Sequence, residues 1–185
     1  MIELRRDEAN ERQPQSVRVN KTTVRVYINH RSEERTDETR DETTTRTVYI
    51  ADFIEVETAS NDPLEVAKRA VSKAILDYDS SEAVNQFSIK GSPMWLDKDT
   101  RAGLKLRLEA EQSAGKENTT LWYGTEAITL PVTNAIVMLN RLEIYASESY
   151  DVTQGHLARV ALMESVEEVL GYDYTEGYPE KLIMR

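Results

Sequence analysis

The stretch SVRVNKTTVRVYI, residues 16–28, decides how the first part of the chain folds. Apolar side chains alternate with polar ones in two successive registers, at Val17 and Val19 and then at Val24, Val26 and Ile28. An alternation with a period of two is typical of a β-strand with one buried face. The phase changes over residues 20–23, which indicates either a β-bulge or a tight hairpin at that point.

A second strand is predicted in TRTVYIADFIEV, residues 45–56. Its apolar positions again alternate, at Val48, Ile50, Ile54 and Val56, and Asp52 interrupts the set. Two strands of this kind, close in sequence, favour antiparallel pairing. We therefore expect residues 1–60 to form a β-rich N-terminal portion.

Between these strands lies RSEERTDETRDETTTR, residues 31–46, which holds only charged and hydroxylic side chains. Such a segment has no apolar side chain whose burial could offset the entropy lost on ordering. We predict a charged hairpin loop over residues 31–46. It is either a solvated hairpin tip or an arm that becomes ordered against a neighbouring subunit.

Helical spacing dominates after residue 60, so residues 61–185 are expected to form a domain of helices with a small β-hairpin. The predicted elements are a helix from Pro63 to about Asp79, a helix after the cap residue Asp97, a hairpin over residues 119–132, and two antiparallel helices, one over residues 134–147 and one after Thr153. The fold class is therefore α+β, with an N-terminal antiparallel β portion followed by a mainly helical unit.

Composition excludes several classes of function. The chain has no cysteine and a formal net charge of −10, so thiol chemistry is excluded and binding to nucleic acid is not expected. No apolar stretch reaches the length of a membrane span, and the charged N-terminus does not resemble an export signal. We expect synthesis in a cytoplasm and no membrane partner.

No group of residues has the spacing of a known catalytic or metal site. The two histidines, His30 and His156, lack the HxxxH or HExxH spacing of a metal site and are expected at the surface or at a helix start. The acidic pair Asp97 and Asp99 is explained by helix capping and the helix dipole. We therefore predict no catalytic residue, no metal, no cofactor and no enzyme activity.

The aromatic residues allow two interpretations. Tyr172, Tyr174 and Tyr178 follow the last predicted helix, and they either pack back onto the helices or form a contact surface for protein or sugar. Trp95 and Trp122 are predicted as packing residues of the helical domain, so truncating either should lower thermal stability.

Residues 87–185 resemble an uncharacterised domain of tailed-bacteriophage and prophage tail and virion proteins. Four motifs carry the resemblance: MWLDKDTRAGL (94–104), LWYG (121–124), LNRLEIYASESYDVTQGH (139–156) and YDYTEGYPEKL (172–182). The resemblance implies a virion location and no assigned catalytic residue. It leads us to expect a structural protein of the tail or portal-proximal region, in several copies or as a homo-oligomer, that docks other virion proteins or fibres.

The expected contact residues come from both ends of the chain: Val24, Val26, Ile28, Val48, Ile50, Tyr172, Tyr174 and Tyr178. In the β-rich portion, a strand could be added to a neighbouring protein through main-chain hydrogen bonds. The alternatives are a tail-fibre assembly factor that leaves the particle and a glycan-binding module, the latter suggested by the tyrosine-rich end.

Overall fold

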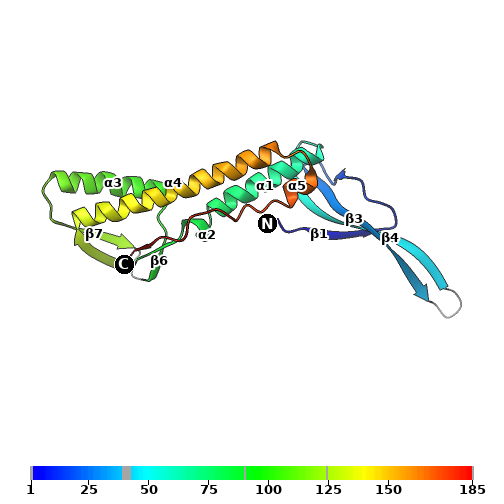
Figure 1. Cartoon of the computed structure of the whole chain (residues 1–185), viewed down its shortest axis with the longest axis horizontal. Helices are drawn as coiled ribbons and strands as arrows, with labels where there is room; N and C mark the ends of the chain where they lie inside the picture. The colour runs from blue at the N-terminus through cyan, green and yellow to red at the C-terminus, as the bar shows by residue number, and fades with distance from the viewer. Residues whose placement is uncertain (1, 39–42, 90, 124, 185) are drawn as a thin grey trace. The chain divides into compact units, whose positions relative to one another are not determined.

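The computed structural model describes residues 2–38, 43–89, 91–123 and 125–184. The elements in chain order, traced in Figure 1, are β1 (Arg5–Ala9), β2 (Ser16–Arg18), β3 (Thr23–Glu38), β4 (Thr43–Glu57), α1 (Pro63–Asp79), α2 (Glu82–Asn85), β5 (Phe87–Ile89), β6 (Ser92–Met94), α3 (Lys98–Ser113), β7 (Asn118–Tyr123), β8 (Glu126–Pro131), α4 (Val132–Leu162), α5 (Val166–Leu170) and β9 (Ile183–Met184). An antiparallel sheet followed by helices confirms the α+β class.

The chain divides into two compact units that are not contiguous in sequence. Unit 1 contains Met1–Leu76 and Gly155–Glu176, and unit 2 contains Asp77–Gln154 and Gly177–Arg185. The division expected from composition, between residues 60 and 61, differs because segments from the helical half complete the N-terminal unit. Local patterns in a sequence cannot reveal such a return of the chain.

Unit 1 is built on a four-stranded antiparallel sheet with the strand order β1-β4-β3-β2. Of the two alternatives for residues 20–23, the structure forms the hairpin, which joins β2 to β3. The Asn20 side-chain oxygen accepts hydrogen bonds from the backbone N–H of Thr22 at 2.8 Å and of Thr23 at 2.9 Å. This Asn turn explains why the apolar phase changes there.

Both faces of the sheet bury apolar side chains near its centre. One face buries Val24, Val26, Ile28, Val48, Ile50 and Ile54. The opposite face carries a smaller cluster of Tyr27, Ala51 and Phe53, and the Arg25 guanidinium lies 4.1 Å from the Phe53 ring centroid. The short helix α5, which buries Val166, Val169 and Leu170, contacts β3.

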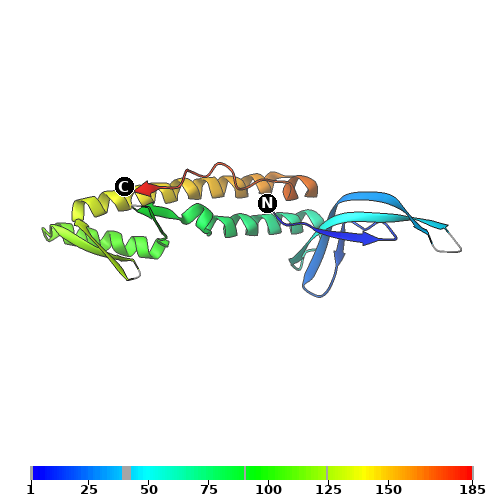
Figure 2. The ribbon, with the colours of Figure 1, turned by 90° about the horizontal axis from the view of Figure 1, so that it is seen from below.

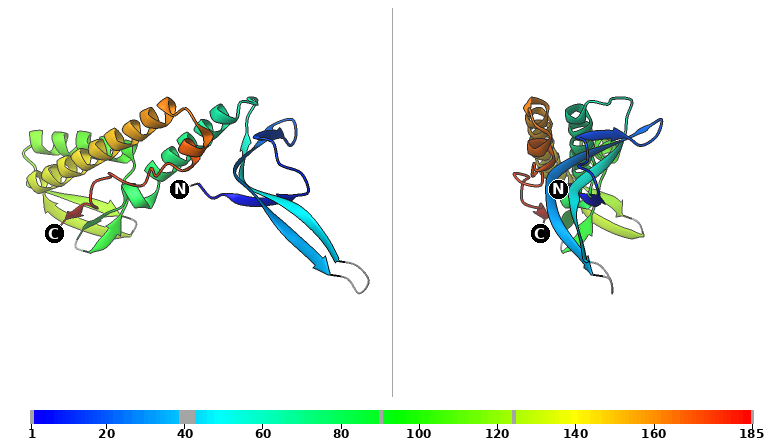
Figure 3. Two further views of the ribbon diagram at one scale, coloured as in Figure 1. Left: turned by 45° about the vertical axis from the view of Figure 1, so that its right-hand side comes forward. Right: turned by 90° about the vertical axis from the view of Figure 1, so that its right-hand side faces the viewer.

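Strands β3 and β4 run on beyond the rest of the sheet as a two-stranded ribbon (Figures 1 and 3). The register pairs Arg31 with Ile50 and continues to Glu38 opposite Thr43. The prediction of a loop over residues 31–46 is therefore wrong for residues 31–38 and 43–46, which are strand. Residues 39–42 of that expected loop lie outside the described residues. Threonines, which favour extended backbone, and the cross-strand ion pair between Asp37 and Arg46 explain the pairing.

Helix α1 confirms the helix predicted after Pro63. Its buried residues Val66, Ala67, Val71 and Ile75 follow the spacing of one helical stripe. Asp62 caps this helix, because its side chain accepts the backbone N–H of Leu64 at 2.9 Å.

In unit 2, helix α3 and the hairpin β7–β8 pack against the first turns of α4, and Figure 2 shows the hairpin in this group. The helix, its cap Asp97 and the hairpin were all predicted correctly. The buried residues of this group are Leu108, Val132, Ala135 and Leu139. A second cluster contains Phe87, Met94, Leu142, Tyr145 and Met184. Three of these residues, Phe87, Met94 and Met184, belong to a small sheet of order β6-β5-β9.

The prediction of two antiparallel helices after residue 133 is wrong, because α4 is a single helix of 31 residues. Hydroxyl side chains at the expected break bond back into the helix. Ser149 donates to the Tyr145 carbonyl at 2.9 Å, and the Thr153 hydroxyl lies 3.1 Å from the Ser149 carbonyl. These side chains satisfy local backbone acceptors without ending the helix.

Both tryptophans differ from the prediction that they pack in the core. Trp95 is 38% exposed and Trp122 is 68% exposed. The core cluster that contains Met94 is instead filled by Phe87, Leu142, Tyr145 and Met184. Packing does not explain the exposure of a large aromatic side chain, so such a residue is a candidate for contact with a ligand or a partner.

Candidate interaction site

The ribbon of β3 and β4 has two chemically different faces. Residues directly opposite in an antiparallel pair point to the same side, and successive residues alternate. The register therefore assigns one face, called the ion-pair face, to Arg31, Glu33, Arg35, Asp37 and Arg46. The other, called the hydroxyl face, carries Ser32, Glu34, Thr36, Thr45 and Thr47.

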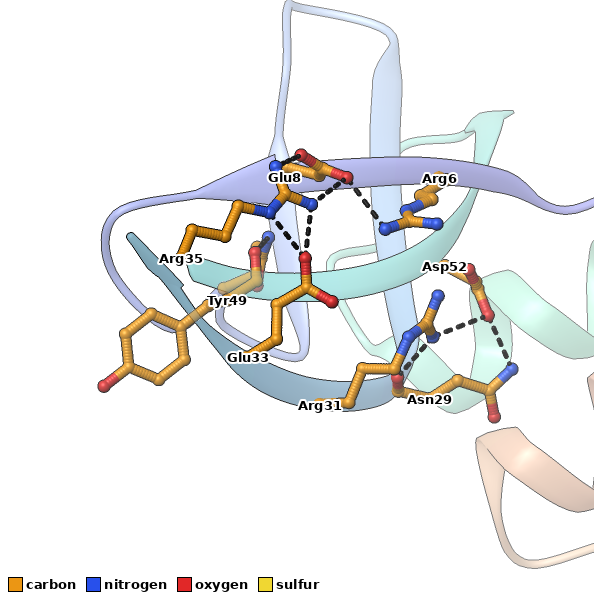
Figure 4. Close-up of polar contacts among 9 residues, drawn as sticks. Arg6, Glu8, Asn29, Arg31, Glu33, Arg35, Tyr49 and Asp52 are labelled. Carbon is orange, nitrogen blue, oxygen red and sulfur yellow. Dashed lines mark hydrogen bonds and ion pairs between the residues drawn. The ribbon is translucent and has the colours of Figure 1, made fainter. Parts of the chain in front are cut away.

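On the ion-pair face, every arginine has a carboxylate partner. Arg35 bonds Glu8 of β1 through Nη1 at 2.9 Å and also pairs with Glu33, and Arg6 pairs with Glu8 at 2.8 Å (Figure 4). The hydrogen bond from Arg35 lowers the pKa of Glu8, and its bonds to Glu8 and Glu33 raise the pKa of Arg35. Each pair is exposed and adds little stability, so the network chiefly fixes how the side chains lie.

Arg35 and Arg46 lie directly opposite each other in the ladder. Like charges in that relation destabilise a strand pair. Carboxylates offset the repulsion, because Asp37 lies 3.3 Å from Arg46 and Glu33 pairs with Arg35. The charges of this face are thus mutually neutralised within the chain.

A β-bulge sets the direction of the ribbon where the ribbon leaves the sheet. The register shifts between Ile28 and Arg31, and Asn29 has a positive φ of 55°, a conformation that asparagine tolerates better than most residues. Asp52 accepts hydrogen bonds from the Asn29 amide at 3.0 Å and from Arg31 at 3.4 Å. The bond from Asn29 is the main cause of the lowered pKa of Asp52, and these contacts brace the bulge (Figure 4).

The hydroxyl face is not neutralised by ion pairs in the same way. All five of its defining side chains are exposed, and Thr36 and Thr45 share a hydrogen bond of 3.3 Å between their hydroxyl oxygens. Tyr49, next along this face, points its ring away from the ion pairs in Figure 4. The five defining residues offer hydroxyl donors and acceptors beside the carboxylate of Glu34.

The outer edges of the ribbon are open within the described part of the chain. Strand β2 pairs only with Val24–Val26 of β3, and β1 pairs only with Tyr49–Phe53 of β4. No third strand pairs with residues 31–38 or 43–48 among the residues that the structure describes. Each free edge presents backbone N–H and C=O groups to a partner.

Five of the eight residues predicted as contacts are aliphatic residues buried in unit 1. Val24, Val26, Ile28, Val48 and Ile50 are each at most 5% exposed, so their side chains form core and not a contact surface. Sequence reasoning recognised the apolar alternation but not that this apolar face would be buried within the chain. It also missed the ribbon. The available signal was the threonine-rich motif TTTRT at residues 43–47, because threonine favours strands.

The tyrosine-rich end is mostly packed, as the first of its two interpretations predicted. Tyr174 is buried at 6% exposure, and the Tyr172 hydroxyl lies 2.6 Å from Nδ1 of His156 in unit 1. In unit 2, the Tyr178 hydroxyl shares a 2.9 Å hydrogen bond with Thr153. None of the three is a freely exposed side chain, which weakens the earlier reason for a sugar platform at this end.

His156 is not at a helix start, contrary to the prediction. It lies inside α4 at 6% exposure, with Nε2 2.9 Å from the Glu176 carbonyl. Because a carbonyl only accepts, Nε2 donates to Glu176, while Nδ1 shares its hydrogen bond with the Tyr172 hydroxyl. The histidine therefore fastens the segment after α5 to the helix.

Among the residues that the structure describes, no group of three or more His, Asp or Glu side chains is placed to hold a metal ion. None of the described helices is both long and apolar enough to cross a membrane. Fold and site together define an α+β protein with an exposed polar β-ribbon. The chain matches no protein-family profile, no curated protein and no solved structure.

Proposed function

We propose that the chain is a structural protein of a bacteriophage virion, in the tail or portal-proximal region, and that it docks other virion proteins through the β3–β4 ribbon. The docking proposal rests on one observation: residues 31–37 and 43–47 form strands although all of these side chains except Arg35 are exposed. The bacteriophage setting rests on the motifs of residues 87–185. The proposal includes no enzyme activity and no cofactor.

An isolated two-stranded ribbon is only marginally stable in water. Its energetic gain within the chain is small, because exposed ion pairs contribute little. An extended segment of a partner could pair with either open edge through main-chain hydrogen bonds, and the exposed side chains would select among partners. The charges of the ribbon hinder indiscriminate edge-to-edge pairing.

A variant with a shortened ribbon can test docking while the rest of the chain stays folded. Replacing residues 34–47 with Asn-Gly joins Glu33 to Val48, which already lie opposite each other, by a two-residue hairpin turn. The buried face that contains Val48 and Ile50 is kept. Circular dichroism should therefore show a folded chain with a melting transition near that of the full-length protein.

Purified particles from cells that express the chain supply the test. Peptide mass spectrometry should detect the full-length protein in particles, and incorporation of the shortened chain should fall by about tenfold or more. A full-length Glu34→Gln variant serves as the control, because it keeps both edges and removes one exposed charge. Incorporation of the shortened chain at the full-length level would refute docking through the ribbon.

The virion assignment has a separate outcome. If the protein is abundant in infected cells and absent from purified particles, the structural role fails and an assembly factor takes its place. If it is present, cross-linking in the intact particle should join residues 31–37 to another virion protein or to a second copy. We expect several copies per particle, which native mass spectrometry of the purified complex would count.

A further inference from the structure

Unit 2 contains a groove of about 560 Å³, separate from the ribbon, that is lined by polar and charged residues together with Trp95, Ala146 and Tyr150. The end of α1, the segment after β6, the start of α3 and the middle of α4 contribute its walls. Ligand pockets in proteins commonly occupy about 300–1,000 Å³, so the groove has room for a small molecule of several rings.

Two aromatic side chains in the groove are exposed without a packing reason. Trp95 is 38% exposed, and Tyr150 is 58% exposed. Tyr150 makes no hydrogen bond with any residue that the structure describes. Exposed aromatic rings next to polar side chains present flat apolar faces, on which a ligand with an apolar side can lie.

The polar side chains of the groove are held in place by bonds that leave binding capacity free. Arg101, whose side chain is 11% exposed, donates at 2.8 Å to Glu143 Oε1 and at 2.8 Å to the Leu96 carbonyl. Asp79 Oδ1 accepts from the Thr153 hydroxyl at 2.7 Å. The other oxygen of each carboxylate, Glu143 Oε2 and Asp79 Oδ2, has no hydrogen bond to any described residue.

The balance of charges in the groove narrows the ligand class. The lining contains three carboxylates and two cationic side chains, so its formal charge is 2 − 3 = −1. Carboxylate oxygens accept hydrogen bonds, while the arginine and lysine of the lining donate them. A purely apolar ligand would leave these groups desolvated and unpaired, and an anionic one would meet the carboxylates.

We propose that this groove binds a neutral oligosaccharide. A sugar ring has an apolar face that can lie on Trp95 or Tyr150, and hydroxyl groups at its rim that both donate and accept. The fixed oxygens of Asp79 and Glu143 accept from those hydroxyls, and the cationic side chains donate to them. Binding is independent of the ribbon, so the groove and the docking site can be tested separately.

Tryptophan fluorescence provides a direct assay, because the chain has only two tryptophans. Trp122→Phe leaves Trp95 as the single tryptophan reporter. Maltotriose, cellotriose, triacetylchitotriose and mannotriose serve as neutral probes, and trigalacturonate serves as the acidic one. We expect at least one neutral trisaccharide to change the Trp95 emission saturably and trigalacturonate to bind at least about tenfold more weakly.

Calorimetry of matched variants assigns any binding to the groove. Trp95→Ala and Tyr150→Ala should each weaken binding of the responding trisaccharide by about tenfold. Trp122→Ala is the control, because Trp122 is more exposed than Trp95 and does not line the groove. Using both groove variants keeps the test decisive if one of them fails to fold.

Three results would overturn the proposal. One is the absence of saturable binding by every neutral probe with folded protein. Another is tighter binding of trigalacturonate than of any neutral probe. The third is an equal loss of affinity in Trp122→Ala and in the folded groove variants.

Discussion

The hydroxyl of Tyr145 permits a sharp test of the packing in unit 2. Tyr145 is 7% exposed, and its hydroxyl donates a 2.6 Å hydrogen bond to the backbone carbonyl of Val84, which is 2% exposed. Tyr145→Phe keeps the ring in the cluster with Leu142 and Phe87. It removes only the donor to a buried carbonyl.

The expected magnitude follows from that geometry. Removing one partner of a buried hydrogen bond costs about 1–3 kcal/mol, because the remaining polar group stays desolvated. We expect Tyr145→Phe to reduce the free energy of unfolding by about 2 kcal/mol. In a chain of this size that corresponds to a decrease of about 4–8 °C in melting temperature.

Urea denaturation followed by circular dichroism measures the loss, with Tyr150→Phe as the matched control. Tyr150 lies in the same helix, is 58% exposed, and has no hydrogen bond to a described residue. Its loss of a hydroxyl should change stability by less than about 0.5 kcal/mol. Equal effects of the two substitutions would refute the assigned role of the Tyr145 hydroxyl.

The same residue predicts a dependence on alkaline pH. Burial raises the pKa of Tyr145 above its ordinary value of 10.0. The folded state therefore holds the phenol proton more tightly than the unfolded state, and the resulting stabilisation is complete below pH 10.0. It is lost as the pH rises from there through the folded-state pKa. The loss should be smaller in Tyr145→Phe, in which only the raised pKa of Tyr27 still contributes.

Three further predictions concern the two units. Hydrogen bonding, first of all from Lys116, lowers the pKa of Glu111 to about 2. The stabilisation that Glu111 contributes is therefore complete above pH 4.5 and is lost as the pH falls toward about 2. Over that range the urea midpoint of Glu111→Gln should fall less than that of the unchanged protein. Asp97→Ala removes the N-cap of α3 and should cost about 1 kcal/mol in thermal unfolding. His156→Ala should speed amide exchange over residues 172–176, and unchanged exchange would contradict the fastening role.

Elements with local signals were predicted well from the sequence. The apolar stripe of α1 and the side-chain cap at Asp97 depend on neighbouring residues only, and both occur where the pattern placed them. The pairing of β5 with β9 was not predictable, because Ile183–Met184 joins a strand almost a hundred residues earlier in the chain. The same reason explains why the return of Gly155–Glu176 to unit 1 was missed.

The candidate sites were harder to predict, because the type of a residue does not determine whether its side chain is exposed. A tryptophan is usually well buried, and both tryptophans were expected to be so. In the structure, the neighbouring residue Met94 is 8% exposed and enters the core, whereas Trp95 remains accessible at 38%. The groove forms around that side chain from residues of α1, α3 and α4, which are far apart in the sequence.

The ribbon shows where composition and structure disagree most directly. Composition predicted a loop over residues 31–46, since nothing in the segment can be buried. Pairing instead extends through residues 31–38 and 43–48, because cross-strand threonines and the ion pair between Asp37 and Arg46 favour the ladder. The bulge at Asn29 sets its direction. These contacts specify the register of the ribbon without burying it. Among the described residues, both outer edges of the ribbon have no paired strand, and this is the geometry from which the docking proposal is argued.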